Sequence, residues 1–139
     1  YEIYQCDWSS DVWLFRSSMI DEYPVAFIAA AMAQGRSIFR GLEELRVKES
    51  DRIAVMAEGL RAIGARVEEI EDGLIVDGTG GEPLPGGGPI AARLDHRIAM
   101  SFAVAGLVSK CGVQIDDMRP VATSFPGFLP LLRSLGAPV

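Results

Sequence analysis

The sequence is poor in the residues that most often form disulfides and metal sites. Its 139 residues include two cysteines, Cys6 and Cys111, and a single histidine, His96. Two cysteines so far apart are too few for a disulfide framework or a four-ligand zinc site. Any metal site would therefore consist mostly of carboxylates, and we expect a reducing, cytoplasmic setting.

An excess of positive charge and long apolar runs are also missing. The chain carries 13 lysines and arginines against 19 aspartates and glutamates, which gives a net charge of −6. Proteins that bind nucleic acid through its phosphates usually have the opposite balance, so this partner is disfavoured. No apolar run reaches the roughly 18 residues of a membrane span, and no basic-then-apolar signal pattern opens the chain. With 49% hydrophobic and 23% charged residues, the sequence predicts a core-forming domain without a membrane partner.

The first residues differ from the rest of the chain. Residues 1–18 contain both tryptophans and show neither a helical nor a strand period. Residues 7–17 resemble a translated DNA-sequencing adapter, so we expect residues 1–17 to be a non-native leader. A real linker or strand is the alternative. Because the chain begins with Tyr1 and not with methionine, we also expect it to be a piece of a longer protein.

From Met19 onward, short strands and helices alternate, which predicts an α/β (α+β) fold. The helices expected over 22–34 and 96–108 are apolar on most faces, which predicts that they are buried. Ser50 and Ser124 are expected to cap two further helices that end at glycines. The remaining predictions are strands at 37–40, 66–70, 74–77 and 113–115, a hairpin turn at Asp72-Gly73, an extended stretch at 45–48 and a loop at 78–88.

An internal repeat relates two parts of the sequence. Ile20-Asp21 matches Leu94-Asp95, 74 positions later, and LRAIGA at 60–65 matches LRSLGA at 132–137, 72 positions later. Between these anchors each copy is predicted to hold a helix, a strand and a second helix. The repeat therefore predicts similar units around a shared helical core, with equivalent helix starts on one side of the assembly.

Basic side chains gather at these helix starts. The clusters consist of Arg46, Lys48 and Arg52 at one start, and of Arg93, His96 and Arg97 at another. Helix N-termini attract anions, and arginine forks bind carboxylate or phosphate, so the clusters indicate a binder of small polyanions. The alternative for the first cluster is ion pairing among its own residues on a solvated face, namely Lys48, Glu49, Asp51 and Arg52. Asp51 and Asp95 would then act only as helix caps.

Four segments match the motifs of a known family in the right order. They are MIDEYP at 19–24, LRVKESDR at 45–52, LDHRIAM at 94–100 and SFP at 124–126. Through them, residues 18–139 resemble the 5-enolpyruvylshikimate-3-phosphate synthase (3-phosphoshikimate 1-carboxyvinyltransferase) family. The resemblance implies the enolpyruvyl transferase fold, an inside-out α/β barrel built from repeated βαβαββ units. Residues 18–139 would then be the C-terminal part of one domain, and so only a partial domain.

The resemblance also implies a reaction. The enolpyruvyl group of phosphoenolpyruvate would move to the 5-hydroxyl of shikimate 3-phosphate, with release of phosphate, on the route to chorismate and the aromatic amino acids. Asp21 would accept the hydroxyl proton and bind shikimate 3-phosphate. Glu49 would give a proton to the methylene carbon of phosphoenolpyruvate and later remove one. No metal or organic cofactor is implied, and the full-length protein would be a monomer.

Four further residues receive binding roles from the same resemblance. Lys48 would contact both substrates, and His96 would donate a supporting hydrogen bond. Arg52 and Arg97 would bind the carboxylate of phosphoenolpyruvate, which also makes them contacts for the inhibitor glyphosate.

Two features depart from the family pattern. Thr123 stands where many relatives carry a lysine that binds phosphoenolpyruvate, and ATSFP at 122–126 resembles a subgroup noted for glyphosate tolerance. The N-terminal domain, which supplies most of the shikimate phosphate site, is absent, so we expect no turnover by this chain alone. The alternatives are an inactive truncated fragment, an anion-binding module without chemistry, and an enzyme like the UDP-N-acetylglucosamine enolpyruvyl transferase. The last of these lacks the run at 48–52 and the Asp-His-Arg motif at 95–97.

Overall fold

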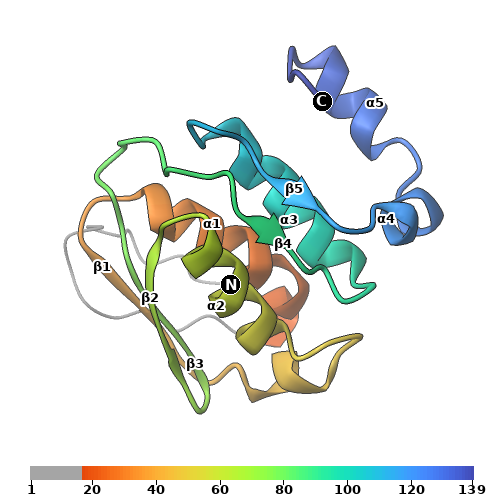
Figure 1. The fold of residues 1–139 in the computed structure, drawn as a ribbon. Coiled ribbons are helices and arrows are strands. Elements are labelled where there is room, and N and C mark those ends of the chain that lie inside the picture. Colours follow the sequence, from red (N-terminus) through yellow and green to blue (C-terminus); the bar gives the residue numbers. More distant parts are fainter. Residues whose placement is uncertain (1–16) are drawn as a thin grey trace.

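Helices and short strands alternate along residues 17–139, the part of the chain that the computed structural model describes (Figure 1). Most of the expected leader lies outside this part. The helices are α1 (Tyr23–Met32), α2 (Arg52–Ala62), α3 (His96–Leu107), α4 (Arg119–Ser124) and α5 (Phe128–Ser134), with 3₁₀ helices at Ser17–Glu22 and Glu43–Val47. The strands are β1 (Arg36–Phe39), β2 (Arg66–Ile70), β3 (Gly73–Asp77), β4 (Pro89–Ile90) and β5 (Gln114–Ile115). None of the helices in these residues is long and apolar enough to cross a membrane.

The larger sheet is antiparallel and has β3 at its centre. Its order is β1-β3-β2, and the β2–β3 hairpin pairs Ile70 with Gly73. The predicted hairpin is thus confirmed, with its turn at Glu71-Asp72, one residue earlier than the predicted Asp72-Gly73. Gly73 is required because a Cβ there would collide with the backbone carbonyl of Phe39 on β1. This close approach places the hairpin turn against the end of β1.

The core lies between this sheet and the helices. Helices α1 and α2 both contact β3, and α3 packs against α1 and α2. The inner face of α2 belongs to this core, because Ile53, Met56 and Leu60 are fully buried, as is Ile63 directly after the helix. Helix α1 buries six of its ten residues, whereas Val25 remains 42% exposed. The prediction that α1 is buried on most sides therefore holds, but one stripe of the helix faces solvent.

The internal repeat is visible in the helix ends. Helix α2 ends with hydrogen bonds from the N–H of Gly64 to Arg61 (3.0 Å) and from the N–H of Ala65 to Leu60 (2.9 Å). The end of α5 repeats this pair at Gly136 and Ala137, with 3.0 Å for each bond. Both glycines have a φ of +91°, the left-handed conformation that this helix-ending motif requires. The two matching sequence segments thus form the same local structure.

Two local predictions were wrong. Residues 45–48 are not extended, because most of them belong to the 3₁₀ helix Glu43–Val47. Leu42 and Leu45 are both fully buried, and the three-residue turn of a 3₁₀ helix brings both to the core. Ser124 does not cap a helix: it ends α4, and α5 begins after Gly127.

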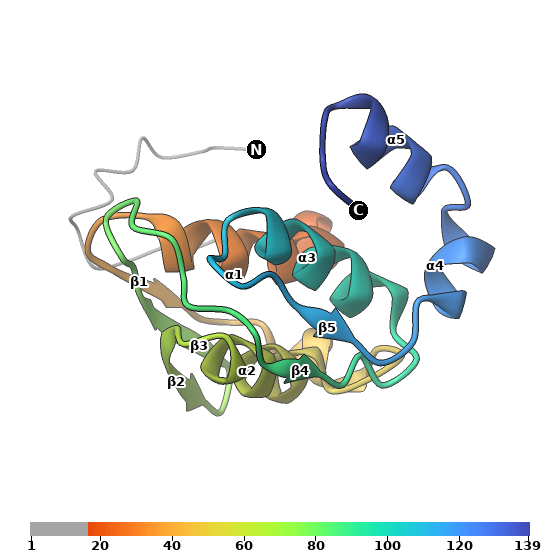
Figure 2. The same cartoon turned by 45° about the horizontal axis from the view of Figure 1, so that its top comes forward.

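The C-terminal helices stand apart from the larger sheet. The strands β4 and β5 pair in parallel on either side of α3 in the sequence, and the chain then continues into α4 and α5. Both views show these two helices projecting beyond α3, on the side away from β1–β3 (Figures 1 and 2). Helix α4 nevertheless contacts α3, so the C-terminal helices stay joined to the rest of the fold.

The contact between α2 and α3 gives a test of the packing. We expect Gly59→Ala to destabilise the protein by about 2 kcal/mol, because its methyl group would overlap the fully buried ring of Phe102. Gly106→Ala is the matched control within a helix, since the nearest atom to its methyl group would be Cγ2 of Val113, at 3.1 Å, at the end of a side chain. The higher helix propensity of alanine should offset the free-energy cost of this contact. Urea unfolding measures both, and an unchanged midpoint for Gly59→Ala would contradict the packing.

Candidate functional site

The centre of the site is a buried arginine. Arg52 is the first residue of α2, and its side chain is 1% exposed. Its Nε lies 2.8 Å from Oδ2 of Asp95, its Nη1 lies 3.0 Å from Oδ1 of Asp21, and its Nη2 lies 2.5 Å from Oε2 of Glu49. A buried guanidinium is tolerated only with such partners. One side chain thus joins the start of α2 to the segments before α1 and α3.

The charge state of Arg52 follows from these contacts. Burial alone would lower its pKa, but the hydrogen bonds and negative charges of Asp95, Glu49 and Asp21 outweigh burial and raise the pKa. Arg52 therefore stays a cation at neutral pH.

Asp95 is the buried partner of Arg52. Its side chain is fully buried and caps α3, accepting from the backbone N–H of Arg97 at 2.9 Å. It also accepts from the hydroxyl of Ser50 at 2.8 Å. Burial would raise the pKa of Asp95, but Arg52, Ser50 and the Arg97 N–H lower it below 3.8. The interpretation of Asp95 as a helix cap only was therefore incomplete, and the expected cap Ser50 serves Asp95 instead, while Asp51 caps α2.

The two predicted acids lie together at the solvent side of Arg52. The side chain of Asp21 is 44% exposed and that of Glu49 is 52% exposed, and each reaches one end of the guanidinium. They come from different parts of the chain, the 3₁₀ helix before α1 and the residues just before α2. The structure thus places two carboxylates within reach of a ligand that approaches Arg52.

The predicted basic clusters divide into two groups. Arg46 binds Asp51, Glu69 and the carbonyl groups at the β2–β3 turn, so it holds the hairpin to α2. Arg93 points to Glu58 on α2, at 3.5 Å. Carboxylates of the same chain therefore already pair with these two arginines.

Lys48, His96 and Arg97 form the second group. Lys48 donates to Glu44 at 2.9 Å, which raises the pKa of Lys48, and the nearby charge of Asp21 adds to this. Arg97 and Asp21 line the same depression, of about 180 Å³. Among residues 17–139, the side chains of Arg97 and His96 have no hydrogen-bond or ion-pair partner. Arg97 is thus a cation beside Asp21 that no described carboxylate neutralises.

A strained turn leads into Asp95. Arg93 and Leu94 have φ values of +54° and +60°, and they alone among the non-glycine residues of 17–139 lie in the left-handed region. This conformation is unfavourable for a residue with a Cβ and recurs near functional sites. A hydrogen bond from the N–H of Asp95 to Ala92 (2.9 Å) closes the turn, and Asp116 holds Ala92 in place. Sequence analysis missed this turn.

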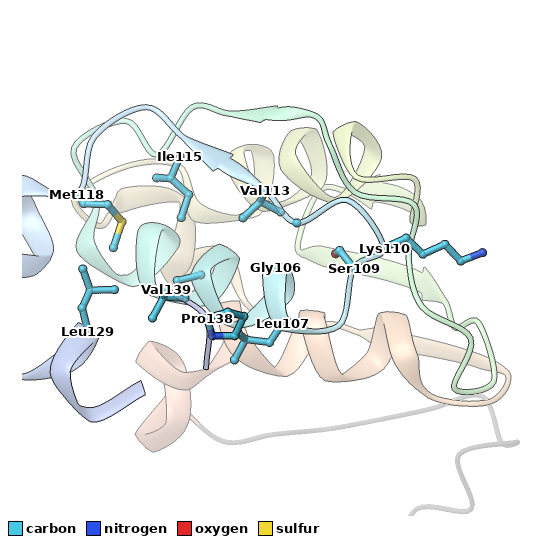
Figure 3. A pocket seen from close by; sticks show the side chains of 12 residues that line it. Gly106, Leu107, Ser109, Lys110, Val113, Ile115, Met118, Leu129, Pro138 and Val139 are labelled. Atoms are coloured by element: carbon cyan, nitrogen blue, oxygen red, sulfur yellow. The ribbon is translucent and has the colours of Figure 1, made fainter. Parts of the chain in front are cut away.

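A larger cavity lies elsewhere. It measures about 600 Å³ and is lined by α3, the segment before β5, and the end of the chain (Figure 3). Its side chains are mostly apolar, and Lys110 points away from it (Figure 3). None of the predicted site residues lines it. This cavity therefore does not fit the binding of small anions.

Within residues 17–139, no group of acids, histidines or cysteines could hold a metal ion.

The geometry can now be compared with known proteins. The model of the EPSP synthase (3-phosphoshikimate 1-carboxyvinyltransferase) family matches residues 11–132. The chain belongs to this family. Because the match begins inside the expected leader, the boundary at residue 17 stays a prediction.

The relatives show how much of the family's length the chain spans. It is 69% identical over 118 residues to the 3-phosphoshikimate 1-carboxyvinyltransferase of Sphingopyxis alaskensis, with 85% of the chain covered. It is 68% identical over 123 residues to that of Zymomonas mobilis, with 86% covered. These matches span 26% and 27% of the two relatives, about a quarter of their length.

Solved structures agree with this assignment. An EPSP synthase from Acinetobacter baumannii matches 84% of this chain and 27% of its own, with 48% identity and a TM-score of 0.80. A second structure from this organism gives 44% identity and a TM-score of 0.77. The chain therefore has the enolpyruvyl transferase fold, as part of a domain, and the fold prediction is confirmed.

The lowered pKa of Asp95 predicts how acid affects stability. A carboxylate whose pKa falls on folding stabilises the protein above its unfolded value of 3.8, and this stability is lost as the pH falls through the folded value. We expect Asp95→Asn to cost about 3 kcal/mol at pH 7 and to make the loss of stability below pH 4 shallower. Asp77→Asn is the control, because Asp77 pairs with Arg36 in solvent and should cost less than about 1 kcal/mol. Denaturant unfolding at pH 7 and below pH 4 measures the free energy of unfolding of each variant. If this free energy falls equally with pH in wild type and Asp95→Asn, the prediction is contradicted.

Proposed function

We propose that the protein to which this chain belongs transfers the enolpyruvyl group of phosphoenolpyruvate to the 5-hydroxyl of shikimate 3-phosphate, releasing phosphate. The family match and the relatives of the same activity support this proposal. The observation that carries it concerns Asp21 and two cations. Asp21 binds the buried Arg52 and shares a depression with Arg97, which has no described partner.

The roles proposed for the single residues are those that the family resemblance implies, and this arrangement is compatible with them. Arg97 and Arg52 bind the carboxylate of phosphoenolpyruvate, because their guanidinium groups can form paired hydrogen bonds with it. Asp21 accepts the proton of the attacking hydroxyl and contacts shikimate 3-phosphate, and Glu49 exchanges a proton with the methylene carbon. Lys48 contacts both substrates and so balances their negative charge, and His96 donates a supporting hydrogen bond. Positioned cations and acids suffice for this chemistry.

The size of the site indicates that a second wall comes from outside this chain. Ligand pockets usually measure about 300–1,000 Å³, whereas the depression beside Asp21 and Arg97 measures about 180 Å³. We propose that the missing three quarters of the protein close the cleft and supply the rest of the shikimate 3-phosphate site. The complete protein then acts as a monomer in the cytoplasm.

Thr123 supplies no cation at the place where many relatives carry a lysine. Its side chain is exposed on α4, and its hydroxyl lies 3.4 Å from the carbonyl oxygen of Arg119 in the same helix. The positive charge that binds phosphoenolpyruvate in this part of the protein therefore comes from Arg52, Arg97 and Lys48.

Binding of phosphoenolpyruvate tests the role of Arg97. We expect Arg97→Gln to weaken binding to this chain about tenfold or more, because a charged hydrogen bond to the ligand is lost. Its stability should not change, since Arg97 has no described side-chain partner. Arg93→Gln is the matched control, because Arg93 belongs to the same basic cluster but points to Glu58. Calorimetric titration measures the affinities, and equal losses in the two variants would contradict the assignment.

Turnover tests the roles of the two acids. We expect no phosphate release by this chain alone, and turnover when it replaces the corresponding quarter of the Zymomonas mobilis relative. In that chimera, Asp21→Asn and Glu49→Gln should each lower kcat by about 10²-fold or more. Glu58→Gln, which alters an exposed acid on α2, should leave kcat unchanged. Steady phosphate release by the chain alone, or full turnover by Asp21→Asn, would overturn the proposal.

A further inference from the structure

The contacts of Arg52 are of two kinds. Asp95, which is fully buried, accepts from Nε of the guanidinium and also from Nη2, at 3.3 Å. Nη1 and the other hydrogen of Nη2 reach Asp21 and Glu49, whose side chains are about half exposed. A buried ion pair with additional hydrogen bonds is fixed in place, while partly exposed pairs exchange readily with solvent and ligands. Arg52 thus has one fixed edge and two ends that a ligand can take over.

Asp95 uses both of its oxygens to join two helix starts. Its Oδ2 accepts from Nε of Arg52 (2.8 Å) and from the hydroxyl of Ser50 (2.8 Å), both at the start of α2. Its Oδ1 accepts from the backbone N–H of Arg97 (2.9 Å) in α3 and lies 3.3 Å from Nη2 of Arg52. One carboxylate therefore sets where the Arg52 side chain lies relative to the backbone of Arg97.

We propose that Asp95, oriented by Ser50, is the positioning residue of this site. It holds Arg52 by its Nε edge, so that a ligand carboxylate can replace Asp21 and Glu49 at Nη1 and Nη2 without movement of the guanidinium. The same exchange releases both acids for proton transfer when the ligand is bound. This inference rests on the proposed function for the identity of the ligand, but the positioning of Arg52 can be tested without one.

The test observes the guanidinium of Arg52 directly, by ¹⁵N NMR of this chain without ligand. The Arg52 signal is assigned by its loss in Arg52→Lys. We expect its Nε–H to exchange slowly and its Nη groups to rotate slowly in the wild type. In Asp95→Asn, the Nε–H should exchange fast and the Nη groups should rotate fast. Ser50→Ala should speed up exchange of Nε–H. Asp21→Asn and Glu49→Gln should leave Nε–H protected, because neither acid contacts Nε.

Asp51→Asn is the matched control. Asp51 also caps a helix and also binds an arginine, Arg46, so its loss perturbs α2 to a similar degree without touching Arg52. We expect the Arg46 signal to change and the Arg52 signal to stay. The proposal is overturned if Asp95→Asn keeps Nε–H of Arg52 protected, or if Asp51→Asn or Asp21→Asn removes that protection equally. If Asp95→Asn does not fold, Ser50→Ala decides, and unchanged exchange in that variant overturns the proposal.

A second arm adds phosphoenolpyruvate. We expect the ligand to shift the Nη signals of Arg52 in the wild type while Nε–H stays protected, and Ser50→Ala to bind about tenfold more weakly. Loss of Nε–H protection on binding would contradict the proposal that Asp95 holds Nε of Arg52 while the ligand is bound. If phosphoenolpyruvate shifts no arginine signal, the proposed function fails in this chain, while the ligand-free spectra still decide the role of Asp95.

Discussion

The burial of one positive charge constrains this structure more than any other interaction. Arg52 is almost fully inaccessible and reaches three carboxylates, and without them its desolvation would cost several kcal/mol. The 3₁₀ helix before α1, the start of α2 and the start of α3 must therefore come together for the fold to be stable. The same convergence assembles the residues proposed for catalysis, so stability and function depend on one set of ion pairs.

The internal repeat explains why two aspartates meet at this arginine. Asp21 and Asp95 occupy matching positions 74 residues apart, and both bind the Arg52 guanidinium. Their exposures differ, since the Asp21 side chain is 44% exposed and that of Asp95 is fully buried. Burial fixes a carboxylate, whereas exposure lets it meet a ligand. Two copies of one motif thus hold their carboxylates in different environments.

Much of this could be predicted from the sequence, because hydrophobic periods and turn residues act locally. The inner face of α2 and the β2–β3 hairpin are of this kind. The helix starts also predicted where the charges gather. The partners of each charge could not be predicted, because they depend on distant segments: Arg46 binds Glu69, 23 residues away, and belongs to the hairpin. Ser50 looked like a cap for α2 but lies against Asp95, 45 residues away.

The left-handed turn at Arg93 and Leu94 has a consequence for any attempt to stabilise this protein. Leu94 is 67% exposed, so its side chain gives little packing in return for an unfavourable backbone conformation. A glycine there would relieve the strain, yet it would also let the chain that delivers Asp95 sample more conformations. Thermal stability would therefore favour glycine at position 94, whereas accurate placement of the Arg52 guanidinium favours the present residue. A trade-off between stability and activity is expected at this position.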